Sequence, residues 1–526
     1  MSESHRGLQA VTLSIFGHLF SAIAEEMGGR LMRSAFSPNI KERRDFSCAL
    51  FDQKGEMIAQ AAHIPVHLGS TPMSVQAVLN DIGRENMQPG DMFVVNDPFA
   101  GGTHLPDITL VAPCFVNDET TPRFFVANRA HHADVGGISP GSMPLSTHID
   151  EEGMRISPTR LSEDVVEWIC QQSRTPEERL GDLQAQQASI HIGQQRLSEL
   201  CMTYGAIYVS EQAEYLQGYT ERVIRSIISD IPDGSYFFDD VMDDDGQGNK
   251  AIAIRCLLNI LGDTATVDWK ASDPQVTGSI NAVRSIVVSA VNYAFRCLAP
   301  ASLPSNGGVM RPIQVLTEAG TVVDALYPAA VSAGNVETSQ RLVDVMMGAL
   351  AQALPNRIPA ASCGSMNNIT IGGLEPRTQQ PFAYYETLAG GTGAGPDFHG
   401  GSALHSHMTN TLNTPVEALE HAYPFRIKEY RIRRESGGAG QFTGGDGLVR
   451  TYAFDCPAEV TLITERRNHA PYGLRGGSPG QPGINVLHAD ENEETLPPKV
   501  SLQVTKGTNV SVATPGGGGW GNEHKE

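Results

Sequence analysis

The stretch that decides the fold of this chain is residues 91–134, DMFVVNDPFAGGTHLPDITLVAPCFVNDETTPRFFVANRAHHAD. Its apolar runs at residues 108–116 and 123–127 predict the two strands of a hairpin. The polar residues 117–122 between the runs predict the turn. The second strand carries a pair of histidines and an aspartate at its end.

Hydrogen-bonding side chains gather where the predicted strands begin or end. A short strand over residues 91–95 stops in a loop, residues 96–104, that is rich in glycine, proline and polar groups. The candidates are Asp45 at the start of another strand, His104 and Asp107 in HLPD, and His131, His132 and Asp134 in HHAD. Imidazole and carboxylate groups without a thiolate suit Mn²⁺, Fe²⁺ or Zn²⁺ at a catalytic site. The alternative is that the aspartates cap turns and that the spacings arise by chance.

Toward the N-terminus the pattern changes from strand to helix. Apolar residues recur about every fourth position over residues 8–34, which predicts a long helix buried on one broad face. Residues 45–51 and 56–60 flank the turn 52–55 and predict another hairpin. A second helix is expected from about residue 73 to residue 82.

Toward the C-terminus helices come first and strands later. Residues 174–230 are rich in helix formers, residues 251–257 and 264–269 resemble strands, and residues 278–298 and 336–354 predict two more helices. Beyond these helices glycine-rich turns recur about every ten residues, which is typical of short strands. We therefore expect a mixed, multi-layer α+β fold, helical and hairpin-rich in its N-terminal part and β-rich in its C-terminal part.

The composition excludes several classes of function. The chain has 526 residues with Lys+Arg 38 against Asp+Glu 59, a formal net charge of −21, so we expect no binding to nucleic acid or to a membrane. Its 8 cysteines include no CxxC pair, which argues against zinc fingers and a disulfide framework and favours a reducing compartment. No apolar run approaches the ~20 residues of a membrane helix, and the N-terminus does not resemble a signal sequence. We expect a cytoplasmic protein.

Other chemistry-bearing residues are less specific. The segment THIDEEG at residues 147–153 offers His148 and two glutamates as acid/base groups or as partners of a metal ligand, although a solvated acidic turn explains it equally well. His63 and His67 are four residues apart, but the intervening Pro65 excludes the helical HExxH arrangement of metalloproteases.

The chain also lacks the marks of three common enzyme classes. Its glycine clusters do not match GxxxxGK[ST], so they indicate tight turns or close backbone packing rather than phosphate binding. Two GxSxG strings contain a proline after the serine, which removes a backbone N–H that a nucleophile elbow needs. No cysteine lies in a motif that marks a nucleophile. An autonomous ATPase, a serine hydrolase and a thiol enzyme are therefore disfavoured.

Several strings together resemble the hydantoinase B / 5-oxoprolinase family. They are KERRDFSC at 41–48, NDPFAGGTHLPD at 96–107 and NRAHHADVGG at 128–137, with STHI at 146–149, GDL at 181–183, GNVETSQ at 334–340, SGGAG at 436–440, TERR at 464–467 and TPGGGG at 514–519. The likeness covers nearly the whole chain, which implies a single family module over residues 1–526. Within it we distinguish a metal-site region (1–230), a mixed α/β region (231–365) and a glycine-rich, β-rich region (366–526).

The resemblance implies one component of a two-component enzyme. Members of the family look like the metal-bearing subunit, whereas a hydantoinase A-like partner binds ATP and Mg²⁺, which this chain would not bind, and phosphorylates the carbonyl oxygen of a small cyclic amide. The assembly implied is an (AB)₂ heterotetramer. The product chemistry implied is ATP-dependent hydrolysis of hydantoin, N-methylhydantoin, 5-oxoproline or a larger lactam.

The resemblance also implies roles for individual residues. The expected ligands of a divalent Mn, Fe, Co or Zn ion are Asp45, His104, Asp107 and His131, and His131 rather than His132 rests on the alignment of a hairpin turn. A water bound to that ion would attack the activated carbonyl, with His132, Asp134 or His148 managing protons. The alternatives are an acetone-carboxylase-like subunit that couples CO₂ to a phosphorylated enolate, and a non-catalytic scaffold for the ATP-binding subunit.

Overall fold

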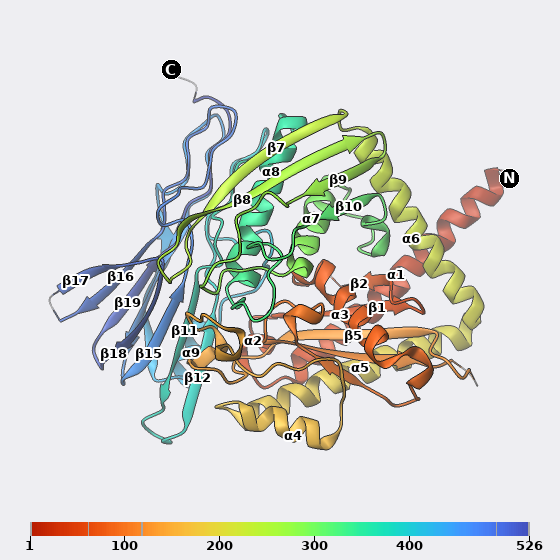
Figure 1. Ribbon diagram of the computed structural model, residues 1–526, viewed down its shortest axis with the longest axis horizontal. Helices are drawn as coiled ribbons and strands as arrows, with labels where there is room; N and C mark the ends of the chain where they lie inside the picture. The colour runs from red at the N-terminus through yellow and green to blue at the C-terminus, as the bar shows by residue number, and fades with distance from the viewer. Residues whose placement is uncertain (1–2, 62, 117–118, 491, 524–526) are drawn as a thin grey trace.

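One antiparallel sheet forms the framework of the N-terminal region. The computed structural model describes residues 3–61, 63–116, 119–490 and 492–523 (Figure 1). The sheet has the strand order β2-β1-β5-β4-β3-β6. Its strands are β1 (Phe46–Asp52), β2 (Met57–Gln60), β3 (Phe93–Val95), β4 (Asp107–Cys114), β5 (Phe124–His131) and β6 (Thr159–Arg160). Both predicted hairpins, β1–β2 and β4–β5, are present, and residues 117 and 118 of the predicted turn lie outside the described residues.

Helices cover both faces of this sheet. The helices α1 (Glu3–Ser34) and α5 (Pro176–Tyr204) pack on one face, and α3 (His67–Ile82) packs on the other. Successive residues of β5 show the alternation: Asn128 donates a hydrogen bond of 2.8 Å to the backbone of Gln186 in α5, whereas Arg129 donates one of 2.7 Å to Ser74 in α3. Because both faces are buried, the central strands are apolar along their whole length.

The remaining helices partly correct the sequence prediction. They are α2 (Pro38–Lys41), α4 (Glu163–Gln172), α6 (Ala206–Ser229), α7 (Arg284–Leu298), α8 (Ser339–Ala353) and α9 (Val416–Ala422). The region 174–230 is two helices rather than one, separated at Gly205, whose φ of 88° ends α5. The helix α3 begins earlier than predicted because Ser289 of α7 accepts hydrogen bonds from its first turn. No helix of the described residues is both long and apolar enough to cross a bilayer.

The middle of the chain adds a second, smaller sheet. Its order is β10-β9-β8-β7, built from β7 (Gly234–Asp244), β8 (Lys250–Leu261), β9 (Thr264–Asp268) and β10 (Ile313–Leu316). The helix α8 packs against β7 and β8, and α7 lies between α8 and α3. This chain of contacts connects the second sheet to the first (Figure 1).

The C-terminal portion is β-rich, as predicted. One sheet has the order β12-β11-β15-β18 and the other β13-β14-β19-β16-β17. The strands are β11 (Asn368–Leu374), β12 (Pro381–Glu386), β13 (Phe425–Arg433), β14 (Gly447–Phe454), β15 (Ala458–Ile463), β16 (Ile484–Ala489), β17 (Asn492–Leu496), β18 (Lys499–Val504) and β19 (Asn509–Ala513). Buried residues of both sheets, such as Ile371 and Tyr452, share one hydrophobic core. The observed class is the predicted α+β fold.

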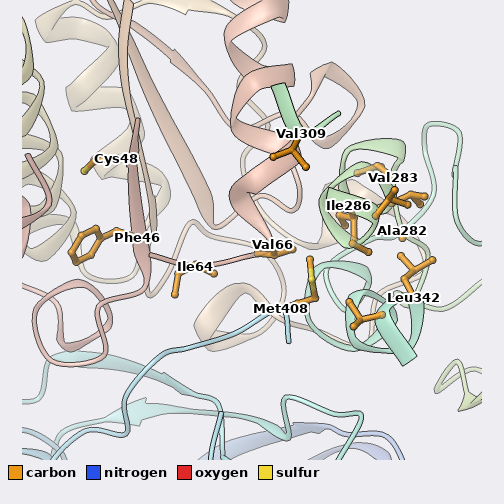
Figure 2. Close-up of a cluster of buried hydrophobic side chains, with 14 of the residues drawn as sticks. Phe46, Cys48, Ile64, Val66, Ala282, Val283, Ile286, Val309, Leu342 and Met408 are labelled. Atoms are coloured by element: carbon orange, nitrogen blue, oxygen red, sulfur yellow. The ribbon is translucent and has the colours of Figure 1, made fainter. Parts of the chain in front are cut away.

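Apolar and ionic contacts join the C-terminal portion to the rest of the chain. Figure 2 shows Met408 beside Val66 and Leu342, so residues from three distant parts of the sequence share one core. In the ionic contact, Arg466 lies 2.5 Å from the carboxylate of Asp344 in α8. It also lies 2.7 Å from the carboxylate of Asp240 in β7. Buried charges need such partners because an unpaired one is costly.

The glycine clusters are sites of close backbone packing. Residues 390–395, 437–445 and 516–519 lie against one another, and Gly517 donates a backbone hydrogen bond of 2.9 Å to Gly445. A Cβ atom on Gly517 would lie 2.0 Å from the backbone oxygen of Thr392. This packing supports the structural interpretation of the clusters over phosphate binding.

We predict that Gly517→Ala lowers the free energy of unfolding by at least about 2 kcal/mol, because a Cβ there meets rigid backbone. Urea denaturation measures the change. Gly29→Ala is the matched control, since its added Cβ would lie 3.4 Å from the flexible end of Arg33 within α1 and should be neutral or stabilising. Equal urea midpoints for Gly517→Ala and the wild type would contradict the packing argument.

Candidate metal centre

The candidate centre lies where β4 begins and β5 ends. In the antiparallel register of these strands Asp107 is directly opposite His131. His104 precedes β4 in a turn in which the Asp107 amide donates a 3.1 Å hydrogen bond to the His104 carbonyl oxygen. Strand pairing and the turn together bring three side chains from two sequence segments to one point.

The ligand atoms of these three residues form a nearly equilateral triangle. Asp107 Oδ1 lies 3.2 Å from His104 Nε2 and 3.4 Å from His131 Nδ1. The two histidine nitrogens are 3.2 Å apart. Ligand atoms about 2.1 Å from one tetrahedral ion would be separated by about 3.4 Å, so the triangle fits a single transition-metal ion. All three side chains are buried.

The electrostatics of the triangle favour a positive charge at its middle. His104 Nδ1 lies 3.1 Å from the carbonyl oxygen of Ser332, which can only accept, so Nδ1 carries the hydrogen and Nε2 is free to bind. Burial lowers the pKa of His104, but the negative charge of Asp107 outweighs it and raises that pKa. Burial alone would raise the pKa of Asp107, yet the charge of His104 and hydrogen bonds hold it well below its usual value. A proton or a metal ion satisfies the same need.

The second oxygen of Asp107 is held by residues that sequence reasoning missed. Thr103 donates to Oδ2, His67 Nε2 lies 3.5 Å from it and Asn335 Nδ2 lies 3.4 Å from it. The orientation of His67 is set by Ser47, whose hydroxyl lies 2.8 Å from Nδ1. The sequence alone presents His67 only as half of a helical pair, and Asn335 only as a letter in the GNVETSQ string.

Asp45, the fourth expected ligand, lies beside the triangle but outside it. Its backbone oxygen accepts a 3.0 Å hydrogen bond from the amide of His131, which ties β1 to the site. Its carboxylate lies 3.8 Å from Arg43, and Asp45 is absent from the group whose ligand atoms all lie within 4.8 Å of one another. Tyr385 of β12 stacks on His131 with ring centroids 4.5 Å apart and so covers the centre. Metal ligation by Asp45 stays a prediction.

The three residues expected to manage protons do not meet at the triangle. His132 points to the opposite face of the sheet, where its Nε2 lies 2.9 Å from Gln186 Oε1 of α5. Asp134 accepts hydrogen bonds from loop backbone and from Arg174. His148 lies 3.4 Å from Asp150, with 40% of its side chain exposed. Their roles in proton transfer stay predictions, and these contacts show other roles for them.

Comparison with known proteins finds relatives along the whole chain. The family model described as hydantoinase B/oxoprolinase matches residues 9–523. A 5-oxoprolinase of Dictyostelium discoideum is 39% identical over 531 residues, which are 98% of this chain and 40% of that protein. A putative D-/L-hydantoinase of a Pseudomonas species, in its B-type subunit, is 28% identical, with 99% of this chain and 92% of that subunit covered. The chain thus spans about two fifths of the 5-oxoprolinase and nearly all of the Pseudomonas subunit.

Two solved structures share the fold. The ATP-dependent caprolactamase from Pseudomonas jessenii superposes with a TM-score of 0.91 at 29% identity, over 98% of this chain and 91% of that one. A nucleotide-free acetone carboxylase superposes with a TM-score of 0.88 at 18% identity, over 99% of this chain and 76% of that one. The second likeness concerns the fold alone.

We predict a pH-dependent stability that originates in part from His132. Burial lowers the pKa of His132 from 6.5 to about 4. The unfolded state then binds more protons between these values, so stability falls as the pH drops from 6.5 toward 4. His132→Gln should reduce the loss of unfolding free energy between pH 7 and pH 4.5 by about 2–3 kcal/mol, measured by urea denaturation at each pH.

The exposed His148 provides the control for this measurement. His148→Gln makes the same chemical change on a side chain that folding leaves largely in water. An identical pH dependence in His132→Gln and the wild type would show that His132 is not buried as a neutral group.

Proposed function

The chain belongs to the hydantoinase B/oxoprolinase family, and we propose that it is the metal-bearing part of an enzyme that opens cyclic amides at the expense of ATP. The observation that carries the proposal is the buried triangle of His104, Asp107 and His131, because two imidazoles and a carboxylate without a thiolate form a catalytic type of donor set. The names of the relatives support the reaction class.

The residues of the chain would hold the ion and keep its surroundings dry. His104, Asp107 and His131 would bind it, with Asp45 as a further ligand from β1. An ion there would supply Lewis acidity, which polarises a carbonyl or phosphoryl oxygen and makes water nucleophilic near neutral pH. The carbonyl of Ser332 fixes the tautomer of His104, and the Tyr385 ring shields His131 from solvent.

His67 and Thr103 would keep Asp107 charged and correctly turned. Both place a donor on Oδ2 of Asp107, which leaves Oδ1 directed at the two histidines. His67 must carry its hydrogen on Nε2 to do so, and the Ser47 hydroxyl then donates to Nδ1. This relay of one hydroxyl, one imidazole and one carboxylate holds the ligand in its ionised form.

ATP chemistry would belong to a partner. The sequence has no phosphate-binding loop, and the chain spans only 40% of the 5-oxoprolinase but 92% of the Pseudomonas hydantoinase subunit. We therefore propose a separate hydantoinase A-like protein, in an (AB)₂ assembly, that phosphorylates the amide oxygen. An amide carbonyl is a poor electrophile, and phosphorylation replaces the oxygen by a much better leaving group. The activated carbon would then be attacked at the centre described above.

Metal analysis and an activity assay test the proposal together. We predict that the purified chain holds about one equivalent of a transition metal per chain and that His104→Ala loses it, because His104 is one corner of the triangle. Metal content is measured by mass spectrometry. With the ATP-binding partner and ATP, the variant should also lose ring opening of hydantoin, 5-oxoproline or caprolactam while part of the ATPase activity remains.

The controls separate the alternatives. His421→Ala, in the exposed helix α9, should keep both metal and ring opening. Turnover that requires bicarbonate would favour a carboxylase over a hydrolase. A wild-type chain that supports ring opening without any bound metal would sink the proposal and favour a scaffold.

A further inference from the structure

The side chain of Asn335 lies against two corners of the triangle. Its Nδ2 atom is 3.0 Å from His104 Nε2 and 3.4 Å from Asp107 Oδ2. Asn335 is 5% exposed, and its Oδ1 atom has no hydrogen-bond partner among the described residues. A buried amide oxygen without a partner is costly, so the structure leaves one acceptor unused beside the candidate metal centre.

The chemistry of His104 decides which end of this amide faces the centre. With its hydrogen on Nδ1, His104 presents a lone pair at Nε2, and the Nδ2–H group of Asn335 is the matching donor. That arrangement holds only while the lone pair is free. Once a cation lies between His104 and Asp107, an N–H group would point its positive end at the cation, and the unpartnered Oδ1 becomes the favoured end.

The backbone around Asn335 is fixed by the fold. Asn335 belongs to a π-helical turn, Gly334–Thr338, that precedes α8, and such turns occur frequently at functional sites. A Cβ atom on Gly334 would lie 1.9 Å from the backbone oxygen of Asn281, so this turn packs directly against another segment. The hydroxyl of Ser339 donates to the backbone oxygen of Asn335 at 2.6 Å. Only the amide itself is left to rotate.

We propose that Asn335 is an additional ligand of the metal ion and binds it through Oδ1. The inference rests on the proposed function, since it needs an ion at the triangle. It adds an amide oxygen to two imidazoles and a carboxylate, a set that suits Mn²⁺ or Fe²⁺ better than a closed zinc site. Asn335 already touches the triangle, whereas Asp45 is paired with Arg43 at 3.8 Å.

Titration of Mn²⁺ alone into the metal-free full chain tests the inference. The dissociation constant is read from the electron paramagnetic resonance signal of free Mn²⁺. Asn335→Leu keeps the approximate volume but removes the oxygen and should weaken binding by at least about tenfold. Asn335→Asp keeps an oxygen and should bind within about threefold of the wild type or more tightly. The buried Asn306, which caps a 3₁₀ turn elsewhere, provides Asn306→Asp as the matched control and should be unchanged.

A crystal structure of the wild type with Mn²⁺ gives a result independent of any variant's folding. Oδ1 of Asn335 within about 2.5 Å of the ion supports the inference, and Oδ1 beyond about 3.5 Å overturns it. Unchanged affinity in Asn335→Leu, or equal weakening in the leucine and aspartate variants, also overturns it while the metal centre stands. Absence of Mn²⁺ binding in both the wild type and Asn306→Asp would instead refute the centre itself, and with it the proposed function.

Discussion

The pairing of β4 with β5 is the constraint on which the rest of the centre depends. It places Asp107 opposite His131, and the pleat then directs His131 toward Asp107 and His132 toward α5. A slip of one residue would exchange these faces and leave His132 beside the carboxylate instead. The register is protected because both faces are buried, with Asn128 and Arg129 anchored to helices on opposite sides.

Local patterns predict the elements of this fold well and their mutual positions poorly. The apolar period of α1 and the two hairpins could be read from the sequence because both depend on neighbouring residues. The choice between His131 and His132 depends on strand register, which no single segment contains. His67 and Asn335 escaped prediction because they reach the site from α3 and from the turn before α8, and only tertiary packing brings those segments together.

The interior of the molecule carries more charge than its composition suggests. Arg466, Asp344 and Asp240 form one buried cluster, and Lys499 and Glu465 form a second pair 2.6 Å apart with both side chains fully buried. Each charge is compensated because an uncompensated one would cost several kcal/mol. Such contacts hold the C-terminal sheets against β7 and α8, and they also limit how those layers can shift. The rigid frame supports a centre whose ligands must stay within tenths of an ångström.

The ring of Tyr385 on His131 has a consequence for the order in which the molecule is made. A ribosome completes His104, Asp107 and His131 long before it reaches Ser332, Asn335 and Tyr385. While the chain is still growing, the three ligands therefore lack both the carbonyl that orients one of them and the aromatic cover over another. Closure of the centre belongs to the end of biosynthesis, and an N-terminal fragment would carry every ligand of the triangle without the enclosure that makes them selective.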